Sequence, residues 1–114
     1  MADEIITDEI TQEKDWTVFA IGGRLDRMTA PQIEERAGAV LASCAKFAVD
    51  VKGRSYISSA GVRILFCLVK QAKAEQKEFA ICGVKGFVKK VLEGSNMHAI
   101  AAIYGERGEL TTNS

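Results

Sequence analysis

The alternation of apolar and polar positions along the chain predicts several short buried strands. Two segments rich in β-branched and aromatic residues, Trp16–Leu25 (WTVFAIGGRL) and Lys46–Gly53 (KFAVDVKG), carry the strongest strand pattern. Phe79–Cys82 (FAIC) predicts a shorter strand, and Ala99–Tyr104 (AIAAIY) a last one.

Helical spacing separates these strands. Residues 29–43 place their apolar side chains on one helical stripe, which comprises Ile33, Ala37, Val40 and Leu41. Thr29 is positioned to cap this helix, and Pro31 lies in its first turn, where proline is tolerated. A second helix is expected over Ser59–Gln76 and a third over Lys85–Gly94.

Strands that alternate with helices indicate an α/β domain with partly parallel pairing. The polar stretch Gln12–Asp15 separates the first strong strand from an acidic segment with Ile5, Ile6 and Ile10, so these two segments are expected to form a hairpin. The predicted sheet is therefore mixed, and the 114 residues make a single domain, 1–114.

The charge distribution argues against nucleic acid as a partner. Lys plus Arg equals Asp plus Glu, at 15 each. The first 15 residues hold six acids and one lysine, a net of −5, which leaves +5 on the rest of the chain. No apolar run approaches the roughly 20 residues that span a membrane, and the N-terminus is acidic, so we expect a cytoplasmic protein without direct membrane insertion.

The three cysteines do not form a metal or redox motif. Cys44, Cys67 and Cys82 are far apart, and each lies in an apolar stretch. We expect them to be small buried hydrophobic residues, with no metal and no cofactor bound by this chain.

Candidate chemistry centres on YISSAGV (Tyr56–Val62), where two serines lie between a strand and a helix. A serine nucleophile needs a base within hydrogen-bond reach, but the only histidine is His98, and the GxSxG spacing is absent. Asp26 and Asp50 are acids whose spacing requires no pairing. No glycine-rich stretch completes a nucleotide-binding motif. An enzyme that uses Ser59 is therefore a disfavoured alternative.

A helix start also explains the serine pair. Ser58 is a good N-cap, and Ser59 and Ala60 fit the first turn. Free backbone N–H groups and the positive end of the helix dipole would stabilise a phosphate there, with Arg54 and Arg63 near in sequence. The pattern therefore allows a simple cap or a phosphorylation switch.

Two segments in this region resemble a known family. FAVDVKGRSYISSAGV (Phe47–Val62) resembles, without a gap, the central motif of STAS domains, most closely that of bacterial anti-sigma factor antagonists. GRLDRMTAPQIEE (Gly23–Glu35) is similar to the family's Gly-x-Leu-Asp turn followed by Thr-Ala at a helix start. With the helix–strand–helix order that follows, the resemblance covers about residues 5–104.

The resemblance implies a fold and a mechanism. The expected fold is a mixed sheet of four to five strands with helices mainly on one side. An unphosphorylated antagonist binds an anti-sigma factor serine kinase, which has a histidine-kinase-like ATPase fold. The kinase then phosphorylates the antagonist, and the complex separates. A PP2C-type phosphatase restores the free hydroxyl, and ATP belongs to the kinase.

Carried onto this sequence, the family's phosphoacceptor is Ser59. Ser58 stands where many relatives have Asp, and Asp26 lies in a loop that approaches the phosphoacceptor in this fold. The partner-binding residues implied by these motifs and their neighbours are Asp26, Met28, Thr29, Ser58, Ala60, Gly61 and Arg63. Methionine suits adaptable binding surfaces, and Arg63 is a charge among apolar neighbours, which favours docking.

The C-terminus departs from the family. Members usually end in an amphipathic helix, whereas Gly105–Ser114 (GERGELTTNS) is polar, so that helix is expected to be missing or one turn long. The uncovered apolar surface would then need a partner or a second copy, as in a weak homodimer. STAS domains also serve elsewhere, so a non-switching adaptor, for example in a lipid-transport ATPase complex, is the main alternative.

Overall fold

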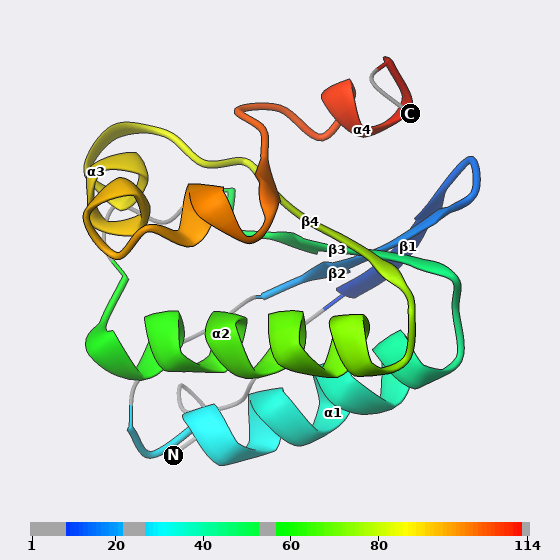
Figure 1. The fold of residues 1–114 in the computed structure, drawn as a ribbon, viewed down its shortest axis with the longest axis horizontal. Helices are drawn as coiled ribbons and strands as arrows, with labels where there is room; N and C mark the ends of the chain where they lie inside the picture. Colours follow the sequence, from blue (N-terminus) through cyan, green and yellow to red (C-terminus); the bar gives the residue numbers. More distant parts are fainter. Residues whose placement is uncertain (1–8, 22–26, 53–56, 113–114) are drawn as a thin grey trace.

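The computed structural model describes residues 9–21, 27–52 and 57–112, and Figure 1 draws the remaining residues in grey. Asp26, Arg54, Tyr56 and the first eight residues therefore lie outside the described part of the chain.

Five strands form one mixed sheet in the order β1-β2-β3-β4-β5. The strands are β1 (Glu9–Glu13), β2 (Trp16–Ala20), β3 (Lys46–Asp50), β4 (Glu78–Cys82) and β5 (Ala102–Ile103). β1 pairs antiparallel with β2, and the other neighbours are parallel. The predicted mixed α/β fold and the opening hairpin are confirmed. The last strand is shorter than expected, because a 3₁₀ helix, η2 (Met97–Ala99), precedes it.

Helices cover one face of this sheet. They are α1 (Ala30–Ala42), α2 (Ser59–Ala74) and α3 (Gly86–Gly94), and Figure 1 shows α1 and α2 below the sheet. Their apolar stripes pack on strand residues that include Phe19, Phe47, Val49 and Ile81. Within α1, Ile33, Ala37 and Leu41 are buried, as the spacing predicted, whereas Val40 is only half-buried.

The opposite face of the sheet is covered by the end of the chain. Residues 105–112, which we call the C-terminal strap, cross above the sheet in Figure 1 and include the single-turn helix α4 (Glu109–Thr112). Leu110 is 1% exposed and lies in a second core with Trp16, Val18, Ala48, Ala80 and Cys82. Strand residues alternate between the two cores, as the pleat requires.

One local expectation was wrong. Thr29 precedes α1, but its side chain makes no capping hydrogen bond, because its backbone is already helical (φ −96°, ψ −15°). Trp16 is buried, yet no acceptor in the described part of the chain reaches its indole N–H. Lys46 instead places its ammonium 5.7 Å from the centre of the indole ring.

Gly83, just after β4, allows the ends of β3 and β4 to approach closely. Its φ is +74°, and a Cβ there would lie 2.5 Å from Asp50 Oδ1 and 2.7 Å from the Lys52 nitrogen. Gly86 also has positive φ, +60°, but nothing lies within 4 Å of a Cβ at that position. Only Gly83 therefore combines backbone strain with a steric conflict.

We expect Gly83→Ala to destabilise the fold more than Gly86→Ala. Gly86→Ala should cost about 1 kcal/mol for its left-handed backbone, and Gly83→Ala about 1–3 kcal/mol more, because the methyl group overpacks Asp50 and Lys52. Urea denaturation followed by circular dichroism measures both variants. If both variants lost the same free energy of unfolding, the residues around Gly83 would have moved to accommodate the added methyl group without cost.

Candidate functional site

The start of α2 is built around Ser58. Its extended backbone (φ −80°, ψ 168°) ends the connection from β3, and its Oγ accepts a hydrogen bond of 3.2 Å from the Gly61 N–H. The Ser58 carbonyl also accepts the Val62 N–H at 3.0 Å. Ser58 is thus the N-cap that the sequence predicted, and one of the two serines has a structural role.

Ser59 is the first residue of α2 and is exposed, whereas Ser58 and Ala60 are half-buried. The cap uses the Ser58 hydroxyl, so the Ser59 hydroxyl is not needed to start the helix. It lies where first-turn N–H groups and the helix dipole favour negative charge. An exposed hydroxyl at this point can accept a phosphate without disturbing the core.

A hollow of about 210 Å³ lies between the starts of α1 and α2, and Ala60, the residue after Ser59, lines it. Its lining consists of Arg27, Ala30, Pro31, Glu34, Ala60, Arg63 and Ile64. Two guanidinium groups, from Arg27 and Arg63, therefore share the hollow with one carboxylate. Sequence reasoning missed Arg27, because nothing in the spacing of residues 27 and 60 indicates that they line one hollow.

The predicted partner-binding residues differ in their exposure. Met28 is 81% exposed, and Arg63 is also exposed. Thr29 and Gly61 are buried, so they present little side-chain surface to a partner. Asp26 lies outside the described residues, so its approach to Ser59 stays a prediction.

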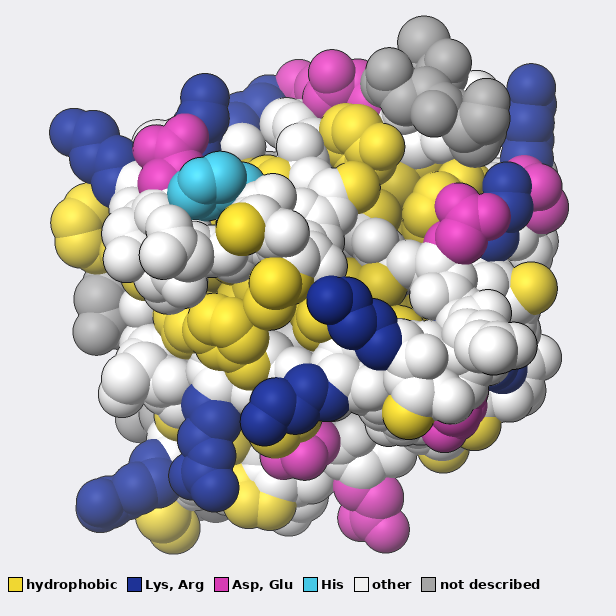
Figure 2. Space-filling view, in the orientation of Figure 1, with side chains coloured by type: hydrophobic (Ala, Val, Ile, Leu, Met, Phe, Trp, Pro, Cys, Tyr) yellow, Lys and Arg dark blue, Asp and Glu magenta, His cyan; other side chains and the backbone are white. Residues whose placement is uncertain are grey.

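His98 does not lie beside Ser59. It lines a different hollow, with Val69 and Lys73 from the second half of α2. Figure 2 shows the histidine of the chain in cyan, at the surface. Ser59 and Val69 are separated by about 15 Å of helix, at 1.5 Å per residue. His98 therefore lies too far from Ser59 to act as a base for a serine nucleophile.

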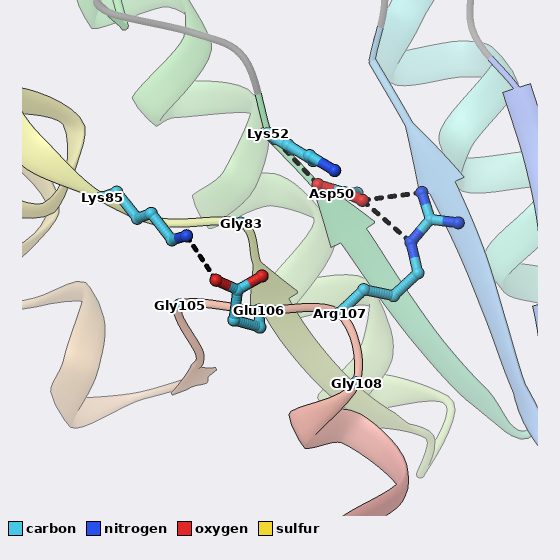
Figure 3. A pocket seen from close by; sticks show the side chains of 8 residues that line it. All are labelled: Asp50, Lys52, Gly83, Lys85, Gly105, Glu106, Arg107 and Gly108. Atoms are coloured by element: carbon cyan, nitrogen blue, oxygen red, sulfur yellow. Dashed lines mark hydrogen bonds and ion pairs between the residues drawn. The ribbon is translucent and has the colours of Figure 1, made fainter.

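A second polar site lies at the ends of β3 and β4, and Figure 3 shows it. The Asp50 side chain is only 2% exposed. Its Oδ2 accepts hydrogen bonds from Arg107 Nε at 2.9 Å and Nη2 at 2.6 Å, and its Oδ1 accepts the Lys52 backbone N–H at 2.8 Å. Arg107 Nη1 also lies 3.6 Å from a carboxylate oxygen of Glu13 in β1. This buried carboxylate is therefore paired and hydrogen-bonded, as burial requires.

The charges in this second site perturb their neighbours. Burial by itself would lower the pKa of Arg107, but the hydrogen bond and the charge of Asp50 outweigh it, so that the pKa is raised. Burial, and then the Asp50 charge, raise the pKa of the Cys82 thiol to about 12. An ion pair between Lys85 and Glu106 borders the same pocket of about 370 Å³ and lowers the pKa of Glu106. Cys82 is thus a protonated, inert thiol at neutral pH.

The described part of the chain lacks two further kinds of feature. None of its histidine, cysteine and acidic side chains gather in a group of three that could hold a metal ion. Among the same residues, no helix has the length and apolar character needed to cross a membrane.

Comparison with known proteins gives consistent matches. The sequence model of the STAS domain family matches residues 7–110. BtrV of Bordetella bronchiseptica, which bears the name of an anti-sigma factor antagonist, is 30% identical over 91 residues, or 79% of this chain and 78% of that protein.

Solved structures share the fold. An anti-sigma factor antagonist from Mycobacterium paratuberculosis has a TM-score of 0.84 at 20% identity, covering 96% of this chain and 94% of that one. The phosphorylated form of the Bacillus cell fate determinant SpoIIAA has a TM-score of 0.70 at 14% identity, covering 95% of this chain and 100% of that one. Identities this low establish the fold alone.

The two serines should differ in their effect on stability. We expect Ser58→Ala to cost about 1 kcal/mol, because the Gly61 N–H loses its capping acceptor. Ser59→Ala should change the free energy of unfolding by less than about 0.5 kcal/mol, since its side chain is exposed. Urea denaturation of the two variants tests this. The reverse order would assign the cap to Ser59.

Proposed function

Because this chain belongs to the STAS domain family, we propose that it is an anti-sigma factor antagonist controlled by phosphorylation of Ser59. In its unphosphorylated form it binds an anti-sigma factor that is itself a serine kinase. The kinase brings ATP and transfers a phosphate to Ser59, the complex separates, and a PP2C-type phosphatase reverses the step. A cytoplasmic location is part of this proposal.

The observation that carries the proposal is that only one of the two serine hydroxyls, that of Ser58, is used to cap α2. Ser58 caps α2 through its Oγ, while Ser59 is exposed in the first turn. A kinase can therefore reach and modify Ser59 without removing the cap. If both hydroxyls were committed to the helix start, phosphorylation would unfold the end of the helix instead of changing a surface.

The chemistry around Ser59 explains how one phosphate could separate two proteins. A phosphoserine adds almost two negative charges near neutral pH. In the free protein those charges would face water, the start of α2 and the cations Arg27 and Arg63. In a complex the same dianion would be desolvated against the partner, which weakens binding. A cost of a few kcal/mol corresponds to one to three orders of magnitude in Kd.

Two relatives support this assignment. BtrV bears the name of an anti-sigma factor antagonist. SpoIIAA, which has the same fold, has been solved in a phosphorylated form. The main alternative is a non-switching adaptor, in which the same surface binds a partner and Ser59 is never modified. An enzyme that uses Ser59 is disfavoured by the position of His98.

We expect the cognate anti-sigma factor kinase, supplied with ATP, to phosphorylate this chain at Ser59 alone. Mass spectrometry should locate the phosphate in the wild type and in Ser58→Ala, and should find none in Ser59→Ala. Ser58→Ala is the matched control, because it removes the neighbouring hydroxyl. Tight binding without phosphate transfer would replace the switch with the adaptor function.

Arg63 should contribute to kinase binding, whereas Lys70 should not. Both are exposed residues of α2, and their spacing of seven places them on the same helical face, about 10 Å apart. We expect Arg63→Ala to raise the Kd for the unphosphorylated complex about tenfold or more and Lys70→Ala to change it less than about twofold. Isothermal titration calorimetry measures both values. Equal effects would point to general electrostatic attraction instead of a docking face at the start of α2.

A further inference from the structure

The pocket of about 370 Å³ lies at the carboxyl ends of β3 and β4 and is bounded by the C-terminal strap (Figure 3). Its volume falls within the range of small-molecule sites, and ligands of parallel sheets commonly bind outside the carboxyl ends of the strands. The lining residues are Asp50, Lys52, Gly83, Lys85, Gly105, Glu106, Arg107 and Gly108. None of these residues belongs to α2, so the pocket is separate from the Ser59 site.

Cations outnumber carboxylates in this lining. Lys52, Lys85 and Arg107 are accompanied by two carboxylates, so the lining residues carry a net charge of +1. Arg107 and Asp50 neutralise each other through two hydrogen bonds. The charges that remain for a ligand are two lysines and Glu106. In the described part of the chain the Lys52 ammonium forms no ion pair, whereas that of Lys85 is paired with Glu106. The pocket therefore favours a negatively charged ligand.

The Glu106 side chain already places a carboxylate in this pocket. One of its oxygens accepts a hydrogen bond from the Lys85 ammonium. The hydrogen bond and the charge of Lys85, and then the charge of Lys52, lower the pKa of Glu106. Both side chains of the Lys85–Glu106 pair are 64% exposed, and exposed ion pairs are weak. A carboxylate from solution can therefore compete with that of Glu106 for Lys85.

The strap does not need the Glu106 carboxylate to keep its position. The Glu106 N–H donates to Glu109 Oε1 at 2.9 Å, and Leu110 is buried in the second core. Just before the strap, the Tyr104 carbonyl accepts the Val84 N–H at 3.1 Å. Rotation of the Glu106 side chain would thus leave these contacts in place. The net charge of the other lining residues would then be +2.

We propose that this pocket binds a small organic acid, whose carboxylate replaces that of Glu106 on Lys85 and is attracted by the charge of Lys52. Glu106 is then a tethered competitor that occupies the site when the acid is absent. The ligand is a carboxylate because the pocket already accommodates one at Lys85. The inference goes beyond the proposed function and does not depend on phosphorylation of Ser59.

An NMR titration of the whole chain with succinate, a small organic acid with two carboxylates, tests the site. Sodium chloride keeps the ionic strength constant, so that general screening does not change. We expect saturable shifts of the amides that line the pocket, with a Kd in the millimolar range, because the contacts are few and partly exposed. Inorganic phosphate is titrated separately. Tighter binding of phosphate at the same amides would overturn the carboxylate assignment.

Two variants of the same ion pair should change the affinity in opposite directions. Glu106→Gln removes the competing carboxylate and should lower the Kd for succinate about threefold. Lys85→Gln removes the cation that binds the ligand and should raise the Kd about tenfold. Lys90→Gln, at an exposed lysine of α3 that does not line the pocket, is the control and should change the Kd less than about twofold.

Both variants at the ion pair lose the same contact between Lys85 and Glu106. If that loss alone mattered, both would shift the Kd in the same direction, and this result would overturn the proposal. Because both side chains are exposed, the variants should fold, which circular dichroism checks. An absence of saturable shifts in Glu106→Gln, where the competitor is gone, would also overturn it.

The titration separates this inference from the proposed function. It contains no kinase and no ATP, and Ser59→Ala should bind succinate with the wild-type Kd, because Ser59 does not line the pocket. A chain that is never phosphorylated can therefore still show the site. A chain that is phosphorylated at Ser59 but does not bind succinate would keep the proposed function and lose this inference.

Discussion

A five-stranded sheet has two apolar faces, and the chain must cover both with 114 residues. Helices α1, α2 and α3 pack on one face, and among the described residues the segment after β5 packs on the other. Leu110 supplies an apolar contact there, and Arg107 neutralises the buried carboxylate of Asp50. The rest of the architecture depends on this short cover, because without it the second face would be open to water.

The buried ion pair and the exposed Ser59 lie at the two ends of the connection from β3 to α2. Parallel strands bring their carboxyl ends, and the connections that follow them, to one edge of the sheet. The buried ion pair lies at that edge and organises the beginning of the connection. The exposed Ser59 lies at its end, where a helix begins. A hydroxyl in the first turn of a helix keeps a defined position while remaining accessible.

Much of this was predictable from local sequence. Period-two and period-3.6 patterns located β3, α1 and α2, since burial of one face dictates which positions are apolar. The Ser58 cap and the single-turn C-terminal helix were also predicted. Contacts between distant segments were not. Arg27 and Ala60 line one hollow because α1 packs on α2, and Arg107 reaches Asp50 across 57 residues. The burial of Leu110 was not predictable, because its sequence neighbours are polar and a single apolar residue shows no periodicity.

That separation of 57 residues also matters when the protein is made. Synthesis proceeds from the N-terminus, so β3 and its carboxylate emerge long before the arginine that will pair with it. A nascent chain can assemble its helices on one face of the sheet while the other face is still bare. Until residues 105–112 have left the ribosome, the growing protein presents an apolar surface with the unpaired Asp50 carboxylate at its rim, the kind of surface that chaperones bind.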